Sequence, residues 1–161
     1  MHTEKNICDN VLGTLLNING KTKDTAKARK DLCHMGIRRD LYLQTNGTST
    51  SMSYAKHTLS KVEKVSFFDL LQCVKFPNGY ASNISLCVNT KNGKISGMKS
   101  HDCHVHLQRL LPVAIPGYLS IEIHTPLIEL CFFFKELCSR TLKLDVLNRM
   151  KDNIVLILCK L

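Results

Sequence analysis

The chain has 161 residues, of which 44% are apolar, so it is long enough for one domain with a buried core. Its 22 Lys and Arg against 13 Asp and Glu give a net charge of +9 with neutral histidines. This surplus favours a polyanionic partner such as DNA, and the alternative is a basic surface without such a partner. No run of about 20 apolar residues exists, as a membrane span requires, and residues 1–20 lack the apolar centre of a signal peptide.

Eight cysteines lie mostly among Leu, Ile and Phe side chains. Thiols in such surroundings usually behave as small buried apolar groups in a reducing compartment. We therefore expect free thiols and a place in the nucleus or the cytoplasm, not a secreted or membrane protein. The cysteines are Cys8, Cys33, Cys73, Cys87, Cys103, Cys131, Cys138 and Cys159.

Two helices are predicted at the start of the chain. Apolar side chains at three- and four-residue spacing indicate a helix over 3–16, and a charged helix over 22–35 is ended by Gly36. Lys and Arg contacts to phosphates give affinity without sequence specificity, so the basic side chains of segment 21–40 are candidate DNA-binding residues. The interspersed acids and the lack of aromatic side chains for base stacking leave a solvated face as the alternative. The candidates are Lys21, Lys23, Lys27, Arg29, Lys30, Arg38 and Arg39.

The middle of the chain is polar and poorly periodic. Residues 44–57 predict an exposed linker. Ser60 and Glu63 form a capping-box pattern that begins a helix reaching about residue 75. Residues 80–98 predict loops with one short strand over 84–88.

From residue 100 onward the pattern is helical. Helices are predicted over 100–114, from Thr125 and Pro126 to about residue 138, and over 144–161, with Thr125 as the cap of the second. That second helix is apolar nearly all round, which places it in the core. The last one ends on its most apolar stretch without a stop signal, so we expect a truncated boundary there. The fold is thus predicted as mainly α, with regions 1–43, 44–57 and 58–161.

Histidine and cysteine are concentrated between residues 101 and 106. Imidazole and thiolate are the usual zinc ligands, which makes His101, Cys103 and His104 a candidate metal site. The alternative is a helix start with hydrogen-bonded histidines, because a zinc site needs three or four converging ligands. Thiol catalysis is not expected, since Cys131 and Cys138 lie seven residues apart on one apolar face. We also expect no deep catalytic pocket and no small-molecule substrate.

A set of strings in collinear order carries a resemblance that covers almost the whole chain. The most specific is Lys99-Ser-His-Asp-Cys-His104, and the others are Met1–Asn17, Lys21–Asp24, Met35–Arg38, Thr58–Lys61, Gly79–Ser85, Leu110–Ile115, Leu127–Phe134 and Ile154–Leu161. Together they resemble plant CACTA-type (En/Spm-like) transposases, from the end of the catalytic domain into the following domain of unknown function. The chain departs from the family pattern over 51–57 and at Pro116, which fits a decayed copy.

The resemblance implies a function in DNA transposition by an RNase H-like core, in which acidic residues hold divalent metal. Only His2 and Glu4 would belong to that core, as a remnant, so we expect no catalysis by the chain alone. The predicted function is an accessory or insertion segment that contacts DNA without sequence specificity, and that holds a transposase subunit or a second copy. One alternative is a protein-interaction module built on the helices of 100–161, and another is a small zinc-stabilised domain.

Overall fold

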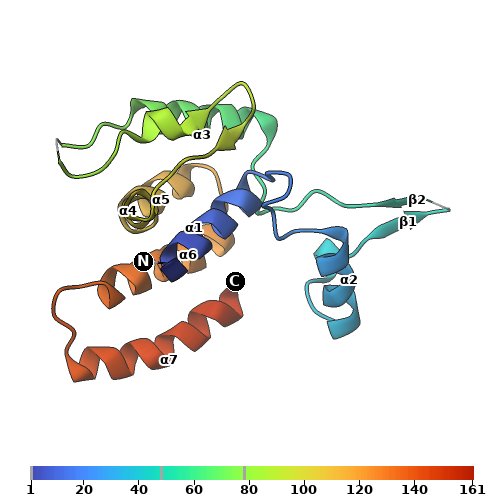
Figure 1. The fold of residues 1–161 in the computed structure, drawn as a ribbon. Helices are drawn as coiled ribbons and strands as arrows, with labels where there is room; N and C mark the ends of the chain where they lie inside the picture. The colour runs from blue at the N-terminus through green and yellow to red at the C-terminus, as the bar shows by residue number, and fades with distance from the viewer. Residues whose placement is uncertain (1, 48, 78) are drawn as a thin grey trace.

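The computed structural model of the chain describes residues 2–47, 49–77 and 79–161, and within them it is mainly helical, as predicted (Figure 1). Three residues lie outside the described part of the chain. Met1 belongs to the first resemblance string, Thr48 to the polar linker, and Asn78 to the turn predicted after the third helix. The helices are α1 (His2–Leu15), α2 (Ala26–Met35), α3 (Lys61–Cys73), α4 (Ser100–Val105), α5 (Leu111–Ala114), α6 (Ile121–Leu137) and α7 (Leu144–Lys160).

Two small antiparallel hairpins complete the fold. β1 (Gln44–Asn46) pairs with β2 (Ser49–Ser51), and β3 (Val88–Asn89) pairs with β4 (Lys94–Ile95). Segment 44–57, predicted as a linker, thus contains a hairpin. The strand predicted over 84–88 is wrong for most of its length, because Ile84–Cys87 forms a 3₁₀ turn that buries Ile84.

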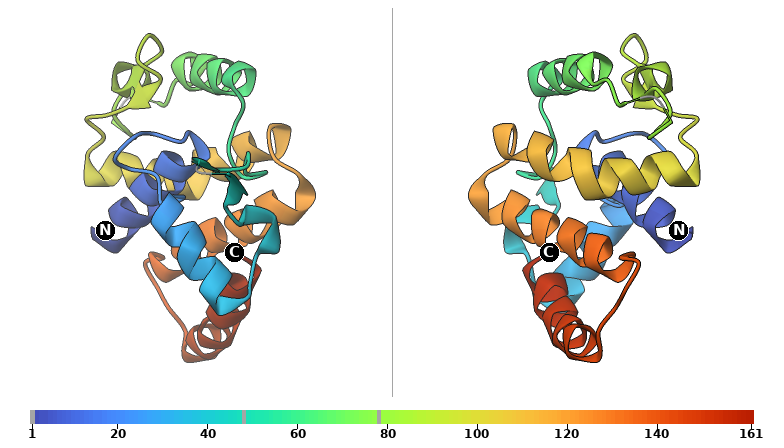
Figure 2. Two further views of the ribbon diagram at one scale, coloured as in Figure 1. Left: turned by 90° about the vertical axis from the view of Figure 1, so that its right-hand side faces the viewer. Right: turned by 90° about the vertical axis from the view of Figure 1, so that its left-hand side faces the viewer.

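The body of the molecule consists of stacked helices (Figures 1 and 2). α1, α4, α5 and α6 lie in the middle, α3 with the β3–β4 hairpin covers one side, and α7 covers the other. α2 and the β1–β2 hairpin extend away from this body (Figure 1), and we call residues 21–53 the basic arm.

One apolar core holds the body together. It joins Leu12 of α1, Phe67 of α3, Leu111 of α5 and Leu130 of α6, all of which are buried. α1 therefore shares its core with the helices after residue 58, and the hydrogen bond from the Leu59 amide to the Leu15 carbonyl (2.8 Å) ties the two segments together.

Local capping signals place the ends of α2 and α3. Thr25 accepts a hydrogen bond from the amide of Ala28, and Gly36 ends α2 with a left-handed φ of 72°. Ser60 and Glu63 form the predicted capping box at the start of α3.

The predicted start of α6 is wrong. The helix begins at Ile121, and the Ser120 carbonyl accepts hydrogen bonds from the amides of Ile123 and His124, so that Pro126 lies inside the helix. Because Ile123 and Pro126 both contribute to the packed inner face, the extra turn adds apolar contact upstream of the proline. α6 was predicted to be buried nearly all round, but only one of its faces lies in the core, since Phe132 is 51% exposed.

The helix predicted over 100–114 is continuous but changes type. Residues His106–Leu110 form a π-helical turn between α4 and α5. Cys103, Leu107 and Leu111 are buried at four-residue intervals, and in a regular α-helix such a stripe drifts about 40° per repeat. The wider turn keeps these side chains on one face, against α1 and α6.

Among the described helices, none combines the length and the apolar character that crossing a bilayer requires.

Candidate functional site

The main polar cluster lies where α1 meets α4. Glu4, in the first turn of α1, is only 1% exposed. Its carboxylate oxygens lie 3.1 and 3.2 Å from Nδ1 of His104, which α4 presents from a position 100 residues further along the chain. Two strings of the resemblance are thereby brought into direct contact.

Gln108 supports the same carboxylate from the next turn of the helix. Its Nε2 donates to Glu4 Oε1 at 2.7 Å and to the Phe134 carbonyl at 3.1 Å, so it links α1 to α6. Cys138, directly after α6, completes the cluster, because its Sγ, His104 Nδ1 and a Glu4 oxygen all lie within 4.8 Å of one another. Among the described residues this is the one group of three that could hold a metal ion.

The electrostatics of the cluster favour an ionised Glu4 and a protonated Cys138. Burial alone would raise the pKa of the Glu4 carboxyl, but hydrogen bonds from His104 and Gln108 outweigh it, so the pKa lies below its usual value. Burial and the neighbouring Glu4 charge raise the pKa of the Cys138 thiol. The thiol is therefore a poor nucleophile at neutral pH.

The structure does not bring His101, Cys103 and His104 together as three ligands of one ion. The ring of His101 stacks beside that of His104, but its Nε2 bonds to the Tyr80 carbonyl at 2.9 Å. Cys103 is fully buried against Cys8. Because successive residues of a helix point in different directions, only His104 reaches the Glu4 cluster.

The two residues that the resemblance assigns to the catalytic core, His2 and Glu4, also lie in different surroundings. His2 is exposed, whereas Glu4 is buried in the cluster. Two members of the cluster, Gln108 and Cys138, were missed by the sequence analysis. The four-residue spacing of His104 and Gln108 on one helix face is a signal for the first, whereas nothing near Cys138 in the sequence indicates its partners.

All eight cysteines lie among the described residues, and each is a free thiol. Cys8, Cys103 and Cys131 are buried as expected, whereas Cys33, Cys73 and Cys159 are exposed, so the expectation of buried thiols is wrong for these three. Cys138 is exposed, which corrects its expected place on the apolar face with Cys131.

Arg29 must be removed from the candidate DNA contacts. Its side chain is 2% exposed, and its Nε and Nη2 each lie 2.6 Å from an oxygen of Asp24. Its Nη1 donates to the Ser53 carbonyl at 2.9 Å. The guanidinium therefore fastens α2 to the segment that follows β2, and it is buried from solvent.

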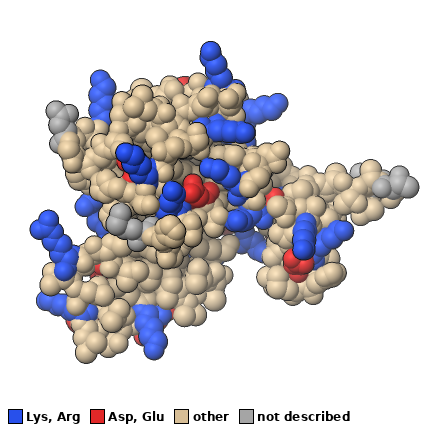
Figure 3. Space-filling model, in the orientation of Figure 1, with Lys and Arg blue, Asp and Glu red and all other residues tan. Residues whose placement is uncertain are grey.

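The other basic residues of the arm are exposed but differ in their surroundings. Lys21 lies 3.9 Å from Asp9, an ion pair between the arm and α1. Lys27 and Lys30 lie one turn apart on α2, opposite the buried Arg29, and Arg39 follows in the 3₁₀ turn Arg39–Leu41. Across the face drawn in Figure 3, Lys and Arg are spread widely and outnumber the acidic side chains.

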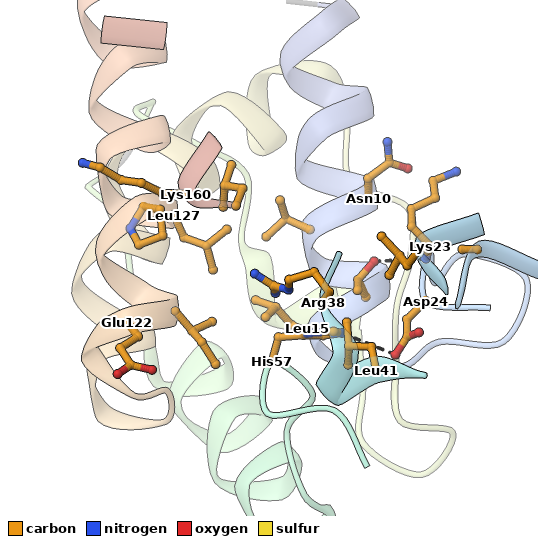
Figure 4. Close-up of a pocket in the computed structure, with 17 residues that line it drawn as sticks. Asn10, Leu15, Lys23, Asp24, Arg38, Leu41, His57, Glu122, Leu127 and Lys160 are labelled. Atoms are coloured by element: carbon orange, nitrogen blue, oxygen red, sulfur yellow. Dashed lines mark hydrogen bonds and ion pairs between the residues drawn. The ribbon is translucent and has the colours of Figure 1, made fainter. Parts of the chain in front are cut away.

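A cavity of about 400 Å³ separates the arm from the body (Figure 4). Leu15, Leu41 and Leu127 supply much of its apolar lining, and Arg38 reaches into it between α1 and α6. Lys23 lies at the same cavity. Arg38 and Lys23 are thus set apart from the outward-facing Lys27, Lys30 and Arg39.

Comparison with known proteins gives no relative from which a function could be transferred. No protein-family model, no curated protein and no solved structure matches the chain. The resemblance to CACTA-type transposases therefore stays a prediction that rests on the sequence strings alone.

Proposed function

We propose that the chain is an accessory segment of a CACTA-type transposase that contacts DNA through phosphates, and that it does not cut or join DNA by itself. The observation that carries the proposal is the exposed charge of the basic arm. Segment 21–40 has seven basic and three acidic residues. The buried Arg29–Asp24 pair withdraws one of each from the surface, which leaves six basic against two acidic side chains.

The shape of the arm supports contact with a polyanion. It extends from the body, so a rod-like partner can approach it without meeting the core helices (Figure 1). Arg29 ties α2 to Ser53, two residues after β2, and this supports the orientation of the helix from which Lys27 and Lys30 project. Because these contacts would reach phosphates only, we expect strong salt dependence and little preference among sequences.

The test is binding of the full chain to random duplex DNA over a range of salt concentrations. We expect log Kobs to fall linearly with log salt, and the triple change Lys27→Gln, Lys30→Gln and Arg39→Gln to reduce the slope by about 3. The matched control neutralises three exposed lysines, of which Lys75 follows the end of α3 and Lys91 and Lys94 lie in the β3–β4 hairpin. It changes the net charge equally and should leave most of the slope in place.

Two outcomes would overturn the proposal. Absence of DNA binding at low salt would remove phosphate contact altogether. An equal loss of slope in the triple variant and in the matched control would mean that affinity follows net charge and that the arm has no special role.

A second candidate function is self-association through α7, and the exposed apolar side chains of that helix favour it. Met150 and Ile157 are buried against the body, but Leu144, Val155 and Leu158 are 73%, 59% and 59% exposed. At helical spacing these three side chains fall on one further face of α7. Exposed apolar patches of this kind commonly mark contacts between proteins.

Sedimentation equilibrium tests this second candidate. We expect a concentration-dependent rise in mass that disappears in the variant Val155→Lys with Leu158→Lys. The control is Leu86→Lys, since Leu86 is 85% exposed on a distant 3₁₀ turn. A monomer at every concentration would contradict self-association.

A further inference from the structure

Three side chains of different chemistry converge at the junction of α1, α4 and the end of α6. Glu4 supplies a buried carboxylate, His104 an imidazole and Cys138 a thiol, with their ligand atoms within 4.8 Å of one another. We propose that Glu4, His104 and Cys138 bind one zinc ion, at a site other than the one predicted from the His101–His106 string. This inference is independent of DNA binding by the arm.

The donor set decides the class of ion. Thiolate, imidazole and carboxylate are the three side-chain ligands that Zn²⁺ takes in proteins, at distances of about 2.0 to 2.3 Å. Mg²⁺ and Ca²⁺ prefer oxygen ligands alone, so a site with one sulfur and one nitrogen disfavours them.

The spacing of the carboxylate and the imidazole already suits a tetrahedral ion. Ligands about 2.05 Å from such an ion lie about 3.3 Å from each other, and His104 Nδ1 lies 3.1 and 3.2 Å from the Glu4 oxygens. The thiol is the member that must move. Cys138 is exposed and follows the last residue of α6, so its side chain has room to turn toward the other two.

Zinc binding replaces protons on the ligand atoms. His104 Nδ1 lies 3.1 Å from both Glu4 Oε1 and Gln108 Nε2. Zinc binding at Nδ1 requires the neutral imidazole with its proton on Nε2. The Cys138 thiol proton is released to solvent, one per ion, and zinc affinity therefore rises with pH.

Gln108 fixes the carboxylate in advance. Its Nε2 donates to Glu4 Oε1 at 2.7 Å, and supporting hydrogen bonds of this kind orient the ligands of known metal ions. Three protein ligands would leave one position of a four-coordinate zinc ion for water.

The test is titration of the metal-free full chain with Co²⁺, a spectroscopic substitute for Zn²⁺. We expect one equivalent to bind, with the near-ultraviolet charge-transfer band that a thiolate–cobalt bond produces, and Zn²⁺ but not Mg²⁺ to displace it. Cys138→Ser should abolish the band and weaken Zn²⁺ binding by at least about 10- to 100-fold, the loss that even supporting residues of metal sites cause. His104→Gln should weaken it similarly.

Matched controls use the nearest equivalents outside the cluster. Cys159→Ser removes another exposed thiol, and His101→Gln removes the neighbouring imidazole. Both should keep the band and the stoichiometry. The proposal is overturned if no thiolate band forms at one equivalent, or if the band survives Cys138→Ser. Thermal unfolding of each metal-free variant checks that it is folded before metal is added.

Discussion

His106 should make the stability of the fold depend on mildly acidic pH. The residue is 1% exposed, and neither ring nitrogen has a hydrogen-bond partner among the described residues. Burial lowers its pKa from 6.5 to about 4. The unfolded chain therefore binds a proton on this residue at a higher pH than the folded chain does.

The sign and size of the effect follow from that shift. Because the folded-state pKa is depressed, the contribution of His106 is fully retained above pH 6.5 and is lost as the pH falls through about 4. A shift of about 2.5 units corresponds to about 3 kcal/mol, which is a large part of the stability of a domain of this size. The fold should weaken steadily as the pH falls from about 6.5 to about 4.

His106→Leu isolates this contribution. We expect the free energy of unfolding, from urea titrations between about pH 7 and about pH 4.5, to be less dependent on pH in the variant than in the original chain. His57 also has a lowered pKa, mainly because of burial. Its contribution to the pH dependence is the same in both proteins and cancels when they are compared. Parallel stability curves for the two proteins would refute the reasoning, because His106 would then titrate as it does in the unfolded chain.

Two further substitutions probe the arm and its attachment. Arg29→Gln leaves Asp24 without its buried partner and should lower the free energy of unfolding by about 3 kcal/mol in urea titrations, whereas a change near zero would mean that the pair is solvated. Gly13→Ala would place a Cβ 2.9 Å from the Lys21 carbonyl oxygen, so its melting temperature should fall, by an overpacking cost of about 1 to 3 kcal/mol. Gly117→Ala is its control, since a Cβ there meets nothing within 4 Å; equal melting temperatures in the two variants would contradict the close approach.

The predictable parts of the fold are those decided by neighbouring residues. Ser60 and Glu63 begin α3 as predicted, and Gly36 ends α2, because capping depends on side chains within one turn of the helix end. The start of α6 was mispredicted from Thr125 because the core contact of Ile123 outweighs the local preference for a cap before proline.

The candidate zinc site shows where reasoning from neighbours fails. The string from His101 to His106 predicted a metal site in the segment that contains His104. The other residues of that string point in different directions from the helix. Glu4 and Cys138 come from α1 and the end of α6, and their convergence on His104 depends on how three helices pack. Arg29 is a similar case, since its surroundings include Ser53, which follows β2, as well as Asp24.

The proposed zinc site and the basic arm lie at opposite ends of α1, so the two proposals can be tested separately. Glu4 is in the first turn of the helix and the arm follows its last turn, and at about 1.5 Å per residue they are about 16 Å apart. Substitutions more than about 10 Å apart without shared partners usually act independently. Cys138→Ser should therefore leave the salt slope of DNA binding unchanged, and neutralising Lys27 and Lys30 should leave the cobalt spectrum unchanged. A change in either cross-measurement would mean that the ion and the DNA act on one conformational equilibrium of α1.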